Sequence, residues 1–278
     1  YKYPETIPDT TIEVLLGVIV SLYTFTTLAL NGRNLDFLSW TKSKLAIRAI
    51  KNPTDGSLLY FVLCVPDICS NAATISTIDY LKSGIFFALG DKMYSIQELR
   101  HYLELHGNSI CSILPSPSNL DPIQFSFYNM PNAEWHRSSV TTILTQVHLM
   151  QTYSQLWGIA CYVGNLLLVS HSPISLFRYV NFVEDNPRTE IFLTKDDRAK
   201  LIDYPNSIAQ IPDEDIIKAL LLKFQHESVV FYLIVDPNIE NDLYEKVHET
   251  LAKIIPELAT VSPDDKKLNF PNNTLVYN

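Results

Sequence analysis

An uncharged stretch near the start of the chain, "VLLGVIVSLYTFTTLAL", constrains the fold more than any other feature. It covers the seventeen positions from Val14 to Leu30. A membrane-spanning helix needs about 20 predominantly apolar residues, and this stretch is shorter and diluted by glycine, serine and threonine. The preceding Asp9 or Thr10 fits a helix cap, with Glu13 in the first turn. We therefore expect a helix that protein covers, and a membrane span is the alternative.

The helix has an unusual pattern around its axis. Glu13, Gly17, Ser21 and Thr24 form one narrow polar or small stripe, and the remaining positions are largely apolar. An ordinary surface helix is apolar on one side only. We expect that the chain's own sheet covers one side and that another protein covers a second side. The alternative is a helix enclosed wholly within its own domain.

The length of 278 residues predicts two domains of ordinary size. We expect an α/β (α+β) chain of tandem units, each a mostly antiparallel sheet flanked by helices. "SKLAIRAI" and "LLYFVLCV" predict a β-hairpin that ends at Pro66, and a helix is expected from Ser70 to Leu89. The proline- and serine-rich stretch 115–122 is the expected linker. The expected domains are residues 1–114, 123–227 and the start of a third, incomplete unit at 228–278.

The second half contains further predicted elements. A strand is expected at Ile123–Tyr128, a helix at Asn132–Tyr153, and a hairpin around the turn Gly164-Asn165. The acidic residues that open "DEDIIKALLLKFQHE" favour a helix from Asp213 to Glu227. "SVVFYLIVD" predicts a buried strand before a long helix and a closing "NTLVYN".

Composition argues against several classes of function. The net charge is −9, and the 18 acidic and 10 basic residues from Glu184 onward account for −8 of it. Nucleic-acid affinity depends on clustered Lys and Arg, so no nucleic-acid partner is expected. The eight glycines form no phosphate-binding motif, and His101 and His106 are five apart, on different faces of a helix. We expect no metal, no cofactor and no catalytic residues, although an unrecognised hydrolase or transferase with a convergent polar pocket is an alternative.

Two stretches resemble a known family. "YKYPETIPDTTIEVLLGVIVSL" resembles the beginning of the longin-repeat family that contains the Ccz subunit of the Mon–Ccz Rab exchange factor, the Hermansky–Pudlak BLOC subunit and Inturned. "LWGIACYVGNLLLVSHSPIS", followed by "TEIFLTKDDRAKLIDYP", resembles the second longin unit, in which a strand, a tight turn and a second strand lead into a short helix.

This resemblance implies a subunit of a heteromeric guanine-nucleotide exchange factor, without catalytic residues of its own. Its partners would be a second longin-type protein, Mon-like or Hermansky–Pudlak-like, and a Rab GTPase. The complex would be cytoplasmic and peripherally recruited to endosomal, lysosomal (vacuolar) or lysosome-related membranes. A longin-type adaptor or scaffold without exchange activity is the alternative. The expected partner or Rab interface lies on the first helix: Val14, Leu15, Val18, Ile19, Leu22, Tyr23 and Phe25.

Overall fold

The computed structural model divides the chain into two compact units. Unit 1 is Tyr1–Phe125 with Tyr179–Val183, and unit 2 is Ser126–Arg178 with Glu184–Asn278. Both contain antiparallel sheets and helices, which confirms the expected α+β class. The structure describes residues 9–29, 35–40, 42–53, 55–113, 145–147, 149–150, 152–163, 166–170, 172–227 and 229–261.

The sheet of unit 1 is a three-stranded meander. Its strands are β1 (Phe37–Trp40), β2 (Ser43–Lys51) and β3 (Leu58–Pro66), in the order β1-β2-β3. The β2–β3 pairing confirms the predicted hairpin, and Gly56 in its turn has a φ of 73°, a conformation that favours glycine. The short strand β1 was not predicted from the sequence.

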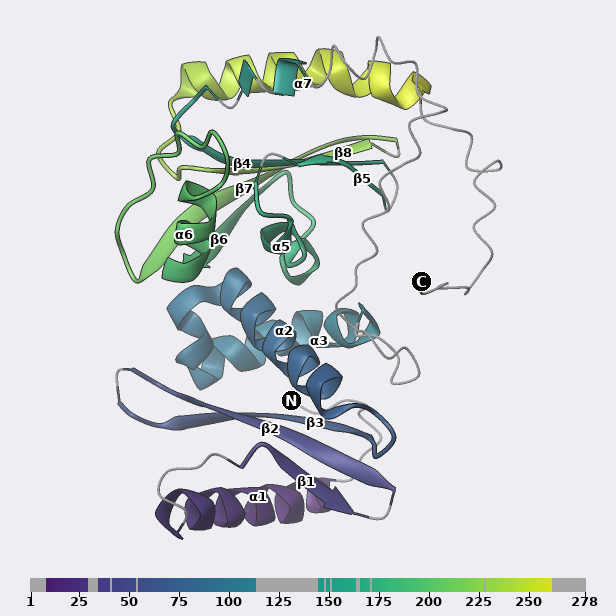
Figure 1. Ribbon diagram of the computed structural model, residues 1–278, viewed down its shortest axis with the longest axis vertical. Coiled ribbons are helices and arrows are strands. Elements are labelled where there is room, and N and C mark those ends of the chain that lie inside the picture. Colours follow the sequence, from purple (N-terminus) through teal and green to yellow (C-terminus); the bar gives the residue numbers. More distant parts are fainter. Residues whose placement is uncertain are drawn as a thin grey trace. The chain divides into compact units, whose positions relative to one another are not determined.

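Helices cover both faces of this sheet (Figure 1). On one face lies α1 (Asp9–Ala29), and on the other lies α2 (Asn71–Leu89). Successive side chains of a strand point to opposite faces. Leu45 and Ile47 of β2 accordingly pack in the cluster that contains Ile19 of α1, whereas Arg48 reaches Asp79 of α2 at 3.3 Å.

The α2 face is completed by further helices. The 3₁₀ helix η1 (Gly90–Tyr94) leads into α3 (Ile96–Ile113), and the short 3₁₀ helix η2 (Val180–Phe182) also belongs to this unit. The helix expected from Ser70 to Leu89 is confirmed, because the Ser70 hydroxyl accepts a hydrogen bond from the Ala73 amide at 3.0 Å and caps α2.

The sheet of unit 2 has five antiparallel strands in the order β5-β4-β8-β7-β6. The hairpin of β4 and β5 is confirmed, and its pairing joins Val163 to Leu166. Strand β8 is central, because β4 pairs with one side of it and β7 with the other. The bounds are β4 Leu156–Val163, β5 Leu166–Ser170, β6 Arg188–Thr194, β7 Ile216–His226 and β8 Val229–Val235.

Helices also flank both faces of this sheet (Figure 1). The long helix α7 (Asn241–Val261) covers one face and packs on a large apolar core. The opposite face carries α5 (Ile174–Phe177) and α6 (Lys195–Ile202). Thr194 and Asp197 form a capping box at the start of α6.

Two expectations are corrected by unit 2. The helix predicted from Asp213 to Glu227 is wrong, because Ile216–His226 forms strand β7. The third unit expected at 228–278 is also corrected for residues 229–261: β8 pairs within this five-stranded sheet, and α7 packs on its core. The linker 115–122, the strand Ile123–Tyr128, most of the helix Asn132–Tyr153 and the closing "NTLVYN" lie outside the described residues.

Candidate functional site

Helix α1 is attached to its sheet by one row of side chains. Ile19 is fully buried and packs on Leu45 and Ile47 of β2, with Leu15 against the same cluster. One turn after Ile19, the ring of Tyr23 meets the Tyr60 ring of β3 edge-on, with centroids 5.3 Å apart. Burial, and then the neighbouring Tyr23, raise the pKa of the Tyr60 phenol. This row fixes which side of the helix faces the sheet.

The rest of α1 presents two apolar rows to the outside. Val14, Val18, Phe25 and Leu28, which we term the outer row, have exposed fractions of 70%, 45%, 61% and 78%. At 3.6 residues per turn, the exposed Leu16, Val20 and Thr27 flank Tyr23 on the side of the helix that meets β3, and we term these three the β3-side row. Neither row contains a charged residue.

The structure separates the predicted interface residues into two sets. Leu15, Ile19, Leu22 and Tyr23 are buried or half-buried on the sheet side, whereas Val14, Val18 and Phe25 are exposed. The exposed Leu16, Val20 and Leu28 were not among the predicted interface residues. Their omission has a physical origin: a helix that is apolar all round gives no periodic signal for its buried side.

The polar stripe lies away from the sheet. Glu13, Gly17, Ser21 and Thr24 are all exposed, and apart from the adjoining residues and backbone of the helix itself, no atom lies within 4 Å of the position that a Cβ would take at Gly17. Within the described residues, Ile19 alone is buried on this helix. The described residues of unit 1 therefore cover this helix on its sheet side only.

Length and composition alone would allow α1 to cross a membrane. Its most apolar 18-residue window has a mean hydropathy of 1.8. Among the described helices, α1 is the one that is both long enough and apolar enough to cross a membrane. Core helices of soluble proteins pass the same test. Here one side of the helix is already occupied by a sheet, which a helix surrounded by lipid would not have.

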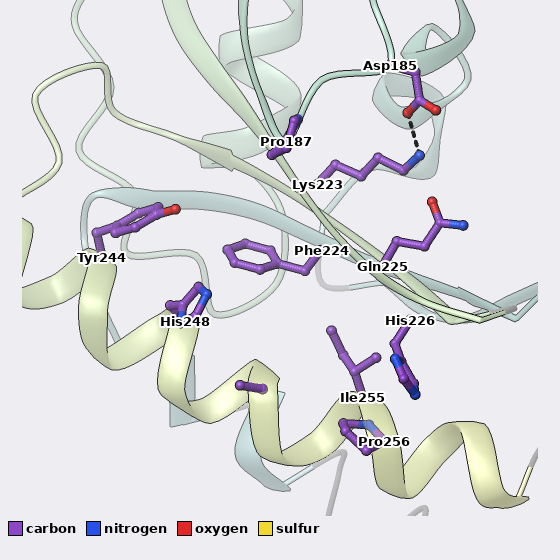
Figure 2. Close-up of a pocket in the computed structure, with 11 residues that line it drawn as sticks. Asp185, Pro187, Lys223, Phe224, Gln225, His226, Tyr244, His248, Ile255 and Pro256 are labelled. Carbon is purple, nitrogen blue, oxygen red and sulfur yellow. Dashed lines mark hydrogen bonds and ion pairs between the residues drawn. The ribbon is translucent and has the colours of Figure 1, made fainter.

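A second candidate feature is a hollow of about 580 Å³ in unit 2, between the end of β7 and the side of α7 that runs from Tyr244 to Pro256 (Figure 2). The amine of Lys223 in its wall pairs with the Asp185 carboxylate. The ring of His248 lies 5.7 Å from that of Phe224 and 6.3 Å from that of Tyr244. The lining is Asp185, Pro187, Lys223, Phe224, Gln225, His226, Tyr244, His248, Ala252, Ile255 and Pro256.

The chemistry of this hollow does not resemble that of a hydrolytic site. Its lining includes no serine, threonine or cysteine to act as a nucleophile beside His226 or His248. Most of its residues are exposed, so it offers an open surface and not a water-excluding cavity. Among the described residues, no three His, Cys, Asp or Glu side chains converge as a metal site would require.

Comparison with known proteins adds no identification. No family model matches the chain, and no curated protein matches it. The two quoted stretches and the exposed surface of α1 are therefore the observations that bear on function.

Proposed function

We propose that this chain is a longin-type subunit of a heteromeric guanine-nucleotide exchange factor for a Rab GTPase. In this proposal the outer row of α1 docks a second longin-type protein, Mon-like or Hermansky–Pudlak-like, and the pair forms the platform for the GTPase. The complex would act in the cytoplasm at endosomal, lysosomal or lysosome-related membranes. The observation that carries the proposal is the exposure of Val14, Val18, Phe25 and Leu28 on one uncharged helix.

The energetics favour a protein partner for this surface. Burying one such side chain contributes about 1.5–3 kcal/mol, so two or three of them would give an interface a substantial apolar centre. Stable obligate interfaces resemble a domain core cut in half. Helix α1 has that character, because Leu15 and Ile19 pack in a core on its sheet side and its outer row is equally apolar.

Nucleotide exchange is compatible with the chemistry of the described residues. An exchange factor stabilises the nucleotide-free GTPase and disturbs its switch and magnesium sites, so the subunit needs no nucleophile or general base. The requirement is a rigid docking surface, and a helix held on a three-stranded sheet provides one.

A matched pair of variants tests the docking surface. Phe25 in α1 and Leu105 in α3 are each 61% exposed, so the same substitution to aspartate can be compared on two surfaces of unit 1. Gel filtration of the chain co-expressed with a Mon-like or Hermansky–Pudlak-like protein should show a complex for the unaltered chain and for Leu105→Asp. Phe25→Asp should weaken the complex by on the order of 30-fold, which corresponds to about 2 kcal/mol. Equal binding by the two variants would refute the outer row as the docking surface.

Exchange activity requires a separate measurement. Release of a fluorescent guanine nucleotide from Rab GTPases is followed with and without the purified complex. Accelerated release supports the exchange-factor proposal, and a stable complex that accelerates none of the Rabs supports the adaptor instead. A chain that binds neither longin-type protein nor Rab would overturn both.

A further inference from the structure

The side chain of Trp157 is enclosed in unit 2, but its ring nitrogen has no protein partner. Trp157 lies in β4 and is 3% exposed. Among the described residues, no group accepts a hydrogen bond from its indole N–H. The indole nitrogen can only donate, and a buried donor that is left unpaired destabilises the folded state. Buried polar groups are normally paired with protein or with ordered water.

A β-bulge places this side chain outside the regular ladder. Leu156 and Gly158 pair with consecutive residues of β8, so Trp157 between them is an extra residue without a partner on that strand. A bulge of this kind bends the strand and redirects a side chain. Trp157 accordingly lines a cavity together with residues of the loop that follows α6.

This loop is attached to the sheet on both sides of the cavity. The Tyr204 hydroxyl donates to the Ser170 carbonyl at 3.3 Å, at the end of β5. The Gln210 amide donates to the Ser154 carbonyl at 3.0 Å, just before β4. Between these two attachments Asn206 has a φ of 61°, a left-handed conformation that asparagine adopts more readily than most residues. The ends of the loop are therefore fixed by direct hydrogen bonds, and the cavity lies under its middle.

The size and lining of the cavity define what it can bind. Its volume is about 20 Å³, and a single water needs roughly 10–15 Å³ of such space. Trp157 forms part of one wall, and Leu201, Asn206 and Ser207 form part of the other. The Ser207 oxygen accepts from the Ala209 amide at 3.4 Å, so its own proton is left to donate. The site thus combines an unpaired donor, further polar groups and room for one small acceptor.

We infer that this cavity binds one long-lived water, which accepts the hydrogen bond of the Trp157 indole and links β4 to the loop after α6. Buried waters typically make about three hydrogen bonds to polar groups that would otherwise be unsatisfied. Larger ligands are excluded, because pockets for small organic molecules measure about 300–1,000 Å³. The inference concerns unit 2 alone and does not depend on the proposed exchange activity.

Nuclear magnetic resonance of the unaltered chain tests the water directly. The chain has three tryptophans, and sequential assignment identifies the indole proton of Trp157. Magnetisation transfer from water to this proton should give a nuclear Overhauser effect and a rotating-frame effect of opposite sign, as expected for a bound water. Effects of the same sign would show exchange of the indole proton with solvent and would overturn the inference. Absence of any transfer would overturn it as well, since the indole would then be dry.

A matched pair of variants tests whether the indole holds the water. Trp157→Phe and Leu201→Ala each remove buried side-chain volume from the wall of the cavity, but only Trp157→Phe removes the donor. Oxygen-17 relaxation dispersion detects waters that stay bound for longer than the protein takes to tumble. Trp157→Phe should lose the contribution of this water, and Leu201→Ala should keep it. Retention of the contribution by Trp157→Phe, or its loss from both variants, would overturn the inference.

Discussion

The attachment of α1 to its sheet depends on Ile19, and its replacement by alanine gives a quantitative prediction. Ile19 is completely buried against Leu45 and Ile47. Replacing isoleucine by alanine removes three carbon atoms, which costs about 2.4 kcal/mol at roughly 0.8 kcal/mol per buried methylene. The cavity left behind adds to this, and buried isoleucine-to-alanine changes cost about 2–5 kcal/mol overall. We expect Ile19→Ala to destabilise unit 1 by about 3 kcal/mol.

The adjacent residue provides the control. Val18 is 45% exposed on the outer row, so Val18→Ala should change the free energy of unfolding by no more than about 0.5 kcal/mol. The assay is urea denaturation of the isolated chain followed by far-ultraviolet circular dichroism. Hydrogen exchange then distinguishes unit 1 from unit 2, because two units need not unfold together. Similar losses for the two variants would refute the packing of α1 on the sheet through Ile19.

Further predictions concern other buried groups. Gly84→Ala should destabilise unit 1 by about 1–3 kcal/mol, because the added Cβ would lie 2.5 Å from the buried Phe182 ring. Gly17→Ala should instead stabilise unit 1 by up to about 1 kcal/mol, because the added Cβ meets open space and alanine favours the helix. Urea denaturation measures both changes. Burial raises the pKa of Tyr162 to about 12, above its ordinary value near 10. The protonated phenol is therefore favoured in the folded chain, so the free energy of unfolding should be constant below pH 10 and fall between pH 10 and 12. Circular dichroism should show a smaller fall for Tyr162→Phe, which has no phenol to ionise. Burial also raises the pKa of the Cys161 thiol, so mass spectrometry should detect its alkylation only after unfolding.

Local patterns predicted much of the fold. The hairpins of β2–β3 and β4–β5 and the helices α2 and α7 follow from alternation, turn residues and periodicity that act over a few positions. Strand β7 was mistaken for a helix for an equally physical reason. It lies between β6 and β8 with helices on both faces of the sheet, so "IIKALLLKF" is apolar on both sides and lacks the period of two that marks a half-buried strand. The acidic residues before it then resembled the start of a helix.

The candidate site was predicted at the level of the element and not of the residue. The uncharged stretch from Val14 onward predicted the helix α1, but its seven expected interface positions are all apolar and gave no means of deciding which faced the sheet. Long-range packing made that choice, because Ile19 meets Leu45 and Ile47 from a strand more than twenty positions away.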